Sequence, residues 1–149
     1  METLFRDGQV TQIANYLGIP KRTVDSVLSK YIGYLKGKLE SGETVKFLNV
    51  CYIRWSGRDV QVRETLAYIS NNIGRELGLS QGLVYRVLTG FEDFLVKDLQ
   101  RLNAYTIRGL FKIRLEKFYD GGYRVRARKS KAYNNVDVYV VTLPSFKRK

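Results

Sequence analysis

The chain has 149 residues, of which 44% are hydrophobic, and a formal net charge of +12. This length supplies one sizeable hydrophobic core, or two small cores that pack together. No apolar run approaches the roughly 20 residues that span a bilayer, and the opening residues, METLFRDGQ, have neither the basic start nor the apolar core of a signal peptide. We therefore expect a soluble protein that is not secreted and has no membrane partner.

The chain has one cysteine, Cys51, and no histidine. A single cysteine excludes an intramolecular disulfide, and without histidine a transition-metal site lacks its usual ligands. Cys51 stands in an apolar alternating run, so a buried position is favoured over a reactive thiol. The sequence contains no glycine-rich phosphate loop and no pair of carboxylates suited to acid–base chemistry. We expect no enzymatic activity, no cofactor, no metal and no small-molecule substrate.

The positive charge is concentrated near the C-terminal end. Residues 1–100 carry 13 basic and 11 acidic side chains, whereas residues 101–149 carry 13 basic and 3 acidic ones. Such clustering is typical of a protein that binds a polyanion, usually nucleic acid. The alternative, solubility alone, requires no clustering.

The chain contains an internal repeat, because the pattern of residues 13–39 recurs at residues 73–99 without a gap. Repeats should be sought first, since they determine the architecture. The matched pairs, all apolar apart from two glycines, are Ile13 with Ile73, Leu17 with Leu77, Gly18 with Gly78, Val24 with Val84, Val27 with Val87, Leu28 with Leu88, Leu35 with Leu95 and Leu39 with Leu99.

The first repeat is predicted to begin with two helices. Apolar spacing from Val10 predicts a helix that ends at Gly18. Pro20 then falls in the first turn of a second helix, where its missing N–H costs nothing. Helical spacing continues to Leu39. The following segment, ETVKFLNVCYIRW, is rich in β-branched and aromatic residues, and residues 56–59 supply turn residues before VQVRE, which together predict a short β-hairpin.

The second repeat is predicted to restart at about Thr65, with a helix that ends at Gly78 and a long helix from about Gln81 to Leu102. The segment YTIRGLFKIRLEKF is the next predicted strand region. Beyond it, residues 118–138 have no counterpart in the first repeat and are predicted to form an extended β-arm. Residues 134–135 are the expected reversal, and DVYVVTL is the expected returning strand.

The order of two helices, a hairpin and an arm resembles the HU and integration-host-factor family. The similarity is carried by the segments IANYLGIPKRTV and IGRELGLSQGLV, by the long second helices, by RGLF at residues 108–111 and by LPSFK at residues 143–147. The resemblance implies an α+β fold of two tandem HU-like repeats, residues 1–63 and 64–149. It also implies that the two repeats form within one chain the dimer that family members form between chains.

The resemblance also implies DNA binding, and the sequence departs from it in two respects. Family arms carry a proline at the tip that wedges between base pairs, whereas this arm has KAYNN at residues 131–135. Repeat one has no arm. An architectural DNA-binding protein therefore remains an alternative in which basic residues contact phosphates without reading sequence. The candidate DNA or partner contacts are Arg124, Arg126, Arg128, Lys129, Lys131, Tyr133, Lys147, Arg148 and Lys149.

The favoured prediction is a non-enzymatic structural or assembly protein. Proteins similar to integration host factor are encoded among the virion genes of some tailed phages, notably the crAss-like group, so the resemblance implies a virion component such as a neck or tail ring. Eleven tyrosines and the many arginines favour protein interfaces. We expect the arm to bind neighbouring copies and other virion proteins, and DNA as well. Localisation would then be the virion, or otherwise the cytoplasm and nucleoid.

A third alternative is a tandem helix-turn-helix regulator, suggested by the spacing of Ala14, Gly18 and Val24. In that motif only the first turns of the second helix enter the groove, and the helix is short. Both second helices are predicted to run for about twenty residues, which disfavours this alternative.

Overall fold

The computed structural model describes residues 9–55, 64–102, 104–107, 110–117, 123–129 and 139–142. The chain is α+β, as predicted. Its described elements are, in order, α1 (Gln9–Leu17), α2 (Lys21–Glu40), β1 (Val45–Phe47), β2 (Cys51–Arg54), α3 (Leu66–Leu77), α4 (Gln81–Leu102), β3 (Ala104–Ile107), β4 (Phe111–Lys117), β5 (Tyr123–Lys129) and β6 (Tyr139–Thr142). None of the described helices is long and apolar enough to cross a membrane.

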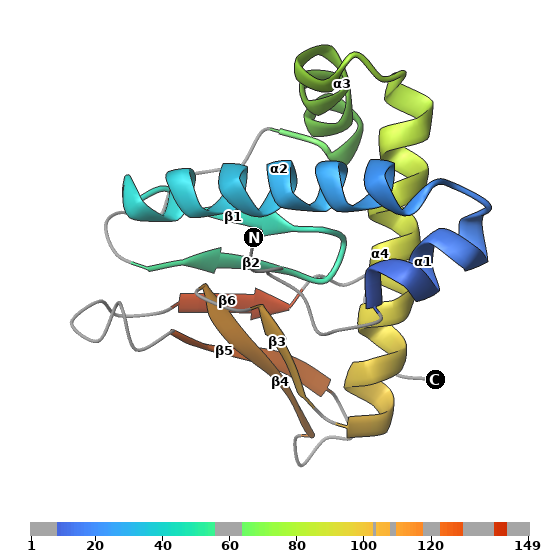
Figure 1. The fold of residues 1–149 in the computed structure, drawn as a ribbon. Coiled ribbons are helices and arrows are strands. Elements are labelled where there is room, and N and C mark those ends of the chain that lie inside the picture. The colour runs from blue at the N-terminus through green and yellow to red at the C-terminus, as the bar shows by residue number, and fades with distance from the viewer. Residues whose placement is uncertain are drawn as a thin grey trace.

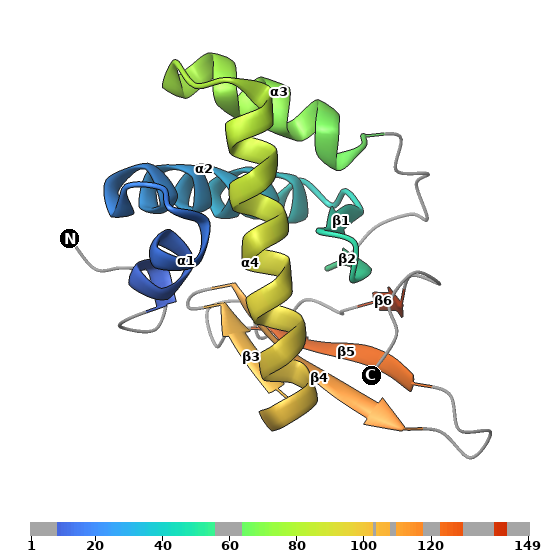
Figure 2. The same ribbon diagram turned by 90° about the vertical axis from the view of Figure 1, so that its right-hand side faces the viewer.

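The strands form two antiparallel sheets of three strands each, ordered β1-β2-β6 and β3-β4-β5. Helix α2 lies along the first sheet, and α4 runs across α2 and down beside the second sheet (Figure 1). Helix α3 lies at the end of the molecule away from β4 and β5, in both Figure 1 and the perpendicular view of Figure 2. The sheets and helices thus meet around α4.

The sequence repeat is also a repeat of local structure. Three backbone hydrogen bonds of the first half recur 60 residues later in the second half. Each first-half bond, from N–H to C=O, is followed here by its second-half counterpart: Ile19 to Ala14 and Leu79 to Gly74; Val24 to Pro20 and Val84 to Ser80; Val50 to Phe47 and Leu110 to Ile107. The hairpin registers also correspond, because Val45 pairs with Ile53 and Tyr105 pairs with Ile113. Each half is therefore two helices followed by a hairpin.

The predicted helix ends are confirmed, and their cause is local. Gly18 and Gly78 have φ of 66° and 70°, the left-handed conformation that glycine adopts without steric cost and that ends a helix. Thr65 caps α3, because its side-chain oxygen accepts a hydrogen bond from the Tyr68 N–H at 3.1 Å. The expected start of the second repeat therefore coincides with a helix cap.

One hydrophobic core joins the two halves. Its apolar residues come from all four helices and from β1 to β4. A series of aromatic contacts crosses it: Tyr31 stacks on Phe47, Phe47 meets Phe91 edge-on, and Phe91 meets Tyr105. Cys51 is fully buried, as predicted, and burial raises the pKa of its thiol. Since the described residues of both halves share this one cluster, the halves stabilise each other.

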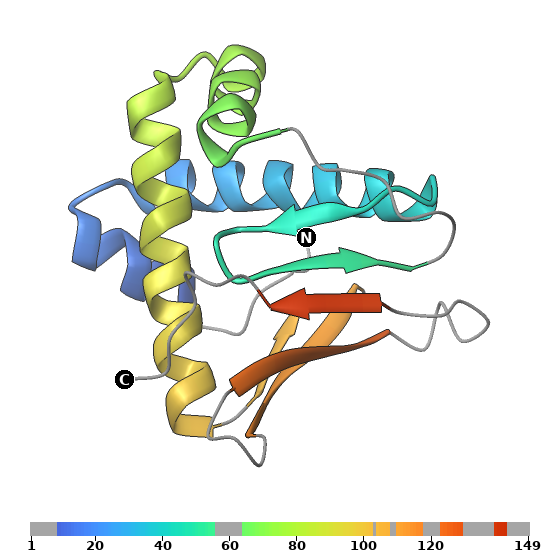
Figure 3. The same ribbon diagram turned by 180° about the vertical axis from the view of Figure 1, so that it is seen from behind.

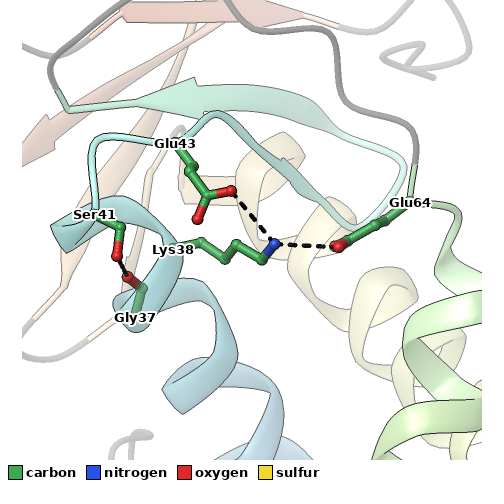
Figure 4. A network of polar contacts seen from close by, with 5 residues as sticks. All are labelled: Gly37, Lys38, Ser41, Glu43 and Glu64. Carbon is green, nitrogen blue, oxygen red and sulfur yellow. Dashed lines mark hydrogen bonds and ion pairs between the residues drawn. The ribbon is translucent and has the colours of Figure 1, made fainter.

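Polar contacts at the C-terminal end of α2 fix where the chain leaves the helix. The Lys38 ammonium lies 3.1 Å from a Glu64 carboxylate oxygen and 3.5 Å from one of Glu43 (Figure 4). The Ser41 hydroxyl donates to the Gly37 C=O at 2.9 Å. Lys38 therefore connects the end of α2 both to the segment before β1 and to the residue before the Thr65 cap of α3.

The turn of the first hairpin differs from the sequence-based prediction. It falls between Phe47 and Cys51, whereas we expected it at residues 56–59, which lie outside the described residues. Leu48 has φ of 51°, a backbone conformation that is uncommon for residues other than glycine. Its backbone N–H donates to the Tyr31 hydroxyl at 2.8 Å. A side chain of α2 therefore stabilises this turn, which could not be predicted from the local sequence.

The last described strand has a partner that the sequence did not predict. Residues 139–142 return beside the arginine-rich strand β5, as expected, but their ladder partner is β2, with Ile53 opposite Val140 (Figure 3). Among the described residues, the first half contributes β1 and β2 to this sheet, and β6 covers the edge of β2 that faces away from β1. The boundary predicted at residues 63 and 64 assigns β6 to the second repeat, whereas β6 completes the sheet of the first.

Candidate functional site

The second sheet presents basic residues on one face and apolar residues on the other. In β4, Lys112 and Arg114 are exposed, whereas Ile113 between them is fully buried. Tyr105 and Ile107 of β3 are also buried, at 5% and 1% exposure. Successive residues of a strand point to opposite faces. The sheet therefore packs on the core through one face and leaves the face of Lys112 and Arg114 to solvent.

The pairing of β5 with β4 adds the predicted arginines to this face. Arg128 stands opposite Lys112, Arg126 opposite Arg114, and Arg124 opposite Glu116. Residues directly opposite each other in an antiparallel pair share a face. We call the face that contains positions 112, 114, 124, 126 and 128 the basic sheet face, on which Lys112 and Arg114 are exposed. The prediction that residues 124–128 lie in an extended strand, with alternate residues on one face, is confirmed at the level of the backbone.

This arrangement places like charges opposite each other across the ladder. Lys112 opposite Arg128 and Arg114 opposite Arg126 are two such pairs, and Glu116 opposite Arg124 is one pair of opposite charge. Like charges directly opposite each other destabilise a strand pair. A bound polyanion would remove that repulsion and would release counterions from its own phosphates. The basic sheet face is thus suited to a ligand with regularly spaced negative charges.

The other predicted contact residues are not brought to this face by the described structure. Lys129 stands opposite Phe111 in the ladder, which places position 129 on the face opposite to 128. Lys131, Tyr133, Lys147, Arg148 and Lys149 lie outside the described residues, as does most of the predicted arm at 118–138.

No protein-family model, no curated protein and no solved structure matches the chain. Its chemistry therefore has to be read from its own residues.

Lys112 and Arg114 were not among the residues predicted from sequence. The alternation that singled out Arg124, Arg126 and Arg128 is also present in FKIRLEK, where charged residues alternate with Ile113 and Leu115. The signal was therefore available in β4, but the sequence did not reveal that β4 and β5 are neighbours.

Three ionisable groups in the described region have altered acidity, and burial is the main cause for each. Desolvation raises the pKa values of Tyr31, Cys51 and Glu92. They take part in packing and in the first hairpin turn, and none belongs to the basic sheet face. Among the described residues, no cluster of three or more histidine, cysteine, aspartate or glutamate side chains is arranged to hold a metal.

Proposed function

We propose that this chain is a non-enzymatic structural protein with a tandem HU-like and integration-host-factor-like fold. In this proposal it is a component of a larger assembly, such as the neck or tail ring of a phage virion. Residues 118–138 bind neighbouring subunits, and the basic sheet face contacts DNA that passes through the assembly. The recurrence of two helices and a hairpin in each half supports the fold assignment.

One observation supports the proposed contact with DNA. The antiparallel register gathers basic positions 112, 114, 124, 126 and 128 on one face of one sheet, where Lys112 and Arg114 are exposed. Phosphate contacts by lysine and arginine give affinity without sequence reading. Such affinity suits a protein that must hold DNA of any sequence.

A pair of double variants tests the basic sheet face. Lys112→Ala with Arg114→Ala should weaken binding to a short DNA duplex and lower the slope of log K against log salt by about 1.8, since each lost phosphate contact contributes about 0.9. The control is Lys21→Ala with Arg22→Ala, which removes two exposed cations from the first turn of α2. Both variants change the net charge equally, so only location distinguishes them.

The same experiment discriminates the helix-turn-helix alternative. In that motif, the first turn of α2 would enter the groove. Binding that survives the β4 substitutions and falls with the α2 substitutions would contradict our proposal. The lengths of α2 and α4, 20 and 22 residues, support the proposal over this alternative.

A second candidate function is a free-standing architectural DNA-binding protein, which the basic sheet face also favours. Light scattering on a sizing column, with and without duplex, separates the two. A discrete oligomer of the 17.2 kDa chain that forms without DNA supports the assembly component. A monomer that shifts only on DNA supports the architectural protein.

A further inference from the structure

The repeat places the first helix of each half against the second helix of the other half, so that α1 packs on α4 and α3 packs on α2. The side chains at these two contacts differ. In one copy, α1 packs closely on α4, because Gly90 admits Leu17: a Cβ at position 90 would lie 2.8 Å from the Leu17 Cδ1 atom. The Tyr16 ring meets the Phe94 ring edge-on, with centroids 5.7 Å apart. An aromatic ring and a close approach therefore complete this contact.

At the equivalent contact between α3 and α2, both the glycine that permits a close approach and the aromatic ring are absent. The repeat places Lys30 where the first contact has Gly90 (30 + 60 = 90), and Glu76 where it has Tyr16 (16 + 60 = 76). Lys30 and Glu76 form an ion pair of 3.0 Å whose side chains are 47% and 61% exposed. An ion pair this exposed contributes little to stability. The Tyr16 ring, which is 60% exposed and contacts Phe94 at the first contact, has no equivalent here.

The result is a cleft of about 550 Å³ between α2 and α3. This volume lies within the range of pockets that hold small molecules or inserted side chains, roughly 300–1,000 Å³. Apolar residues that line it are Tyr34, Ile69, Ile73 and Leu77, and polar ones include Ser26, Ser29, Asn72, Lys30, Asp25 and Glu76. Its lining contains two carboxylates and one ammonium, in a chain whose net charge is +12.

We propose that this cleft binds an aromatic side chain accompanied by a basic residue, presented by a second copy of this chain. The donor segment is Ser-Lys-Ala-Tyr, residues 130–133, which directly follows β5. Tyr133 takes in the cleft the place that Tyr16 has at the first contact. Lys131 of the segment pairs with the carboxylates of the cleft, Asp25 and Glu76. This inference rests on the proposed assembly function and names the receiving surface for the predicted arm.

Two further observations support a second copy as the occupant. The chain's surplus of positive charge lies in residues 101–149, and the cleft is formed by α2 and α3, whose lining has a net negative charge. Helix α3 and strand β5, which leads into the donor segment, lie at opposite ends of the molecule (Figures 1 and 2). A donor and an acceptor at opposite ends produce a head-to-tail contact, the kind that closes rings.

The cleft can be filled by one substitution at a position that tolerates a side chain. Gly33 lines the cleft, and a Cβ there would have no atom within 4 Å. Gly37, one turn later on α2, is equally open but does not line the cleft. Gly33→Phe should raise the apparent dissociation constant of self-association about tenfold or more, which corresponds to loss of a buried aromatic anchor. Gly37→Phe should leave it within about twofold.

Disulfide trapping between two different chains tests the contact directly. A Ser29→Cys chain and an Ala132→Cys chain are mixed under mild oxidation, with the native Cys51 buried in both. The expected result is a mixed disulfide dimer whose yield falls when Gly33→Phe is added to the first chain and persists with Gly37→Phe. Tyr133→Ala in the second chain should lower the yield in the same way.

The outcomes separate this inference from the function on which it rests. Self-association that is unchanged by Gly33→Phe and by Tyr133→Ala would overturn the cleft as the receiving surface while leaving the assembly role intact. A chain that stays monomeric at every concentration, with no mixed disulfide, would overturn the inference as well. In that case the Lys112 and Arg114 variants would still report whether the basic sheet face binds DNA.

Discussion

The Glu92 carboxylate on α4 accepts a hydrogen bond of 2.6 Å from the backbone N–H of Asn49, in the turn between β1 and β2. This contact joins the long helix of the second half to the hairpin of the first. The neighbouring Leu48 N–H donates to the Tyr31 hydroxyl at 2.8 Å. The turn is thus held by one side chain from each half of the molecule.

Glu92 should make stability depend on pH in a specific direction. Burial raises the pKa of Glu92 above its ordinary value of 4.5, with the hydrogen bond from Asn49 acting against this. The folded state therefore binds the proton more tightly than the unfolded state. Lowering the pH from neutral through the raised pKa, and down to about 4.5, should increase the free energy of unfolding.

Glu92→Gln should remove this dependence, because the amide keeps an acceptor and does not titrate. Urea unfolding at a series of pH values measures the free energy of unfolding of wild type and variant. As the pH falls, the wild type should become more stable relative to the variant. Glu40→Gln, at an exposed position of α2, is the control for loss of one carboxylate. A difference that stays constant across the series would contradict the assignment.

Tyr31→Phe should destabilise the protein by about 1–3 kcal/mol, because the buried Leu48 N–H loses its acceptor. The same hydroxyl donates to the Lys46 C=O at 3.3 Å, and that bond is also lost. The variant keeps the ring and so creates no cavity. Chemical denaturation gives the change in unfolding free energy, and Tyr16→Phe, at a ring that is 60% exposed, should lie within about 0.5 kcal/mol of wild type.

Gly74→Ala should be strongly destabilising, by about 2 kcal/mol or more. A Cβ at this position would lie 2.5 Å from the backbone carbonyl oxygen of Leu79, which cannot move without opening the turn between α3 and α4. The equivalent residue of the first half is Ala14, where the corresponding hydrogen bond is longer, 3.1 Å against 2.8 Å.

The matched control for Gly74 is Gly33→Ala, in the interior of α2, where a Cβ meets open space. This variant should gain about 0.5–1 kcal/mol from the higher helix propensity of alanine. Thermal unfolding should therefore shift in opposite directions for the two substitutions. Equal shifts would show that helix propensity, and not the close approach at Leu79, governs position 74.

Helix bounds and core positions could be predicted from sequence because their causes are local. Gly18 and Gly78 end helices by their own conformational freedom, and the spacing of Val24, Val27 and Leu28 determines which face of α2 is buried. The repeat reinforced these signals, since each appears twice. Cys51 was placed in the core by the same alternation.

Strand partners could not be predicted, because alternation gives the face of a residue and says nothing about its neighbouring strand. Arg126 was assigned correctly to a strand, but its pairing with Arg114 depends on the register across the turn. The first hairpin turn depends on Tyr31 and Glu92, which lie 17 and 43 residues away from their partners Leu48 and Asn49. The Tyr31 contact requires α2 to pack on the first hairpin, and the Glu92 contact exists only once the two halves have packed.

The pairing of β6 with β2 has a consequence for the order in which the molecule is made. Cys51 and Thr142 are opposite each other in the sheet although 91 residues separate them (142 − 51 = 91). Because the ribosome delivers the chain from its N-terminal end, the first hairpin is synthesised well before residues 139–142, which complete its sheet. Native pairing at such separation slows folding. The first sheet can therefore be completed only after the strands of the second half have been synthesised.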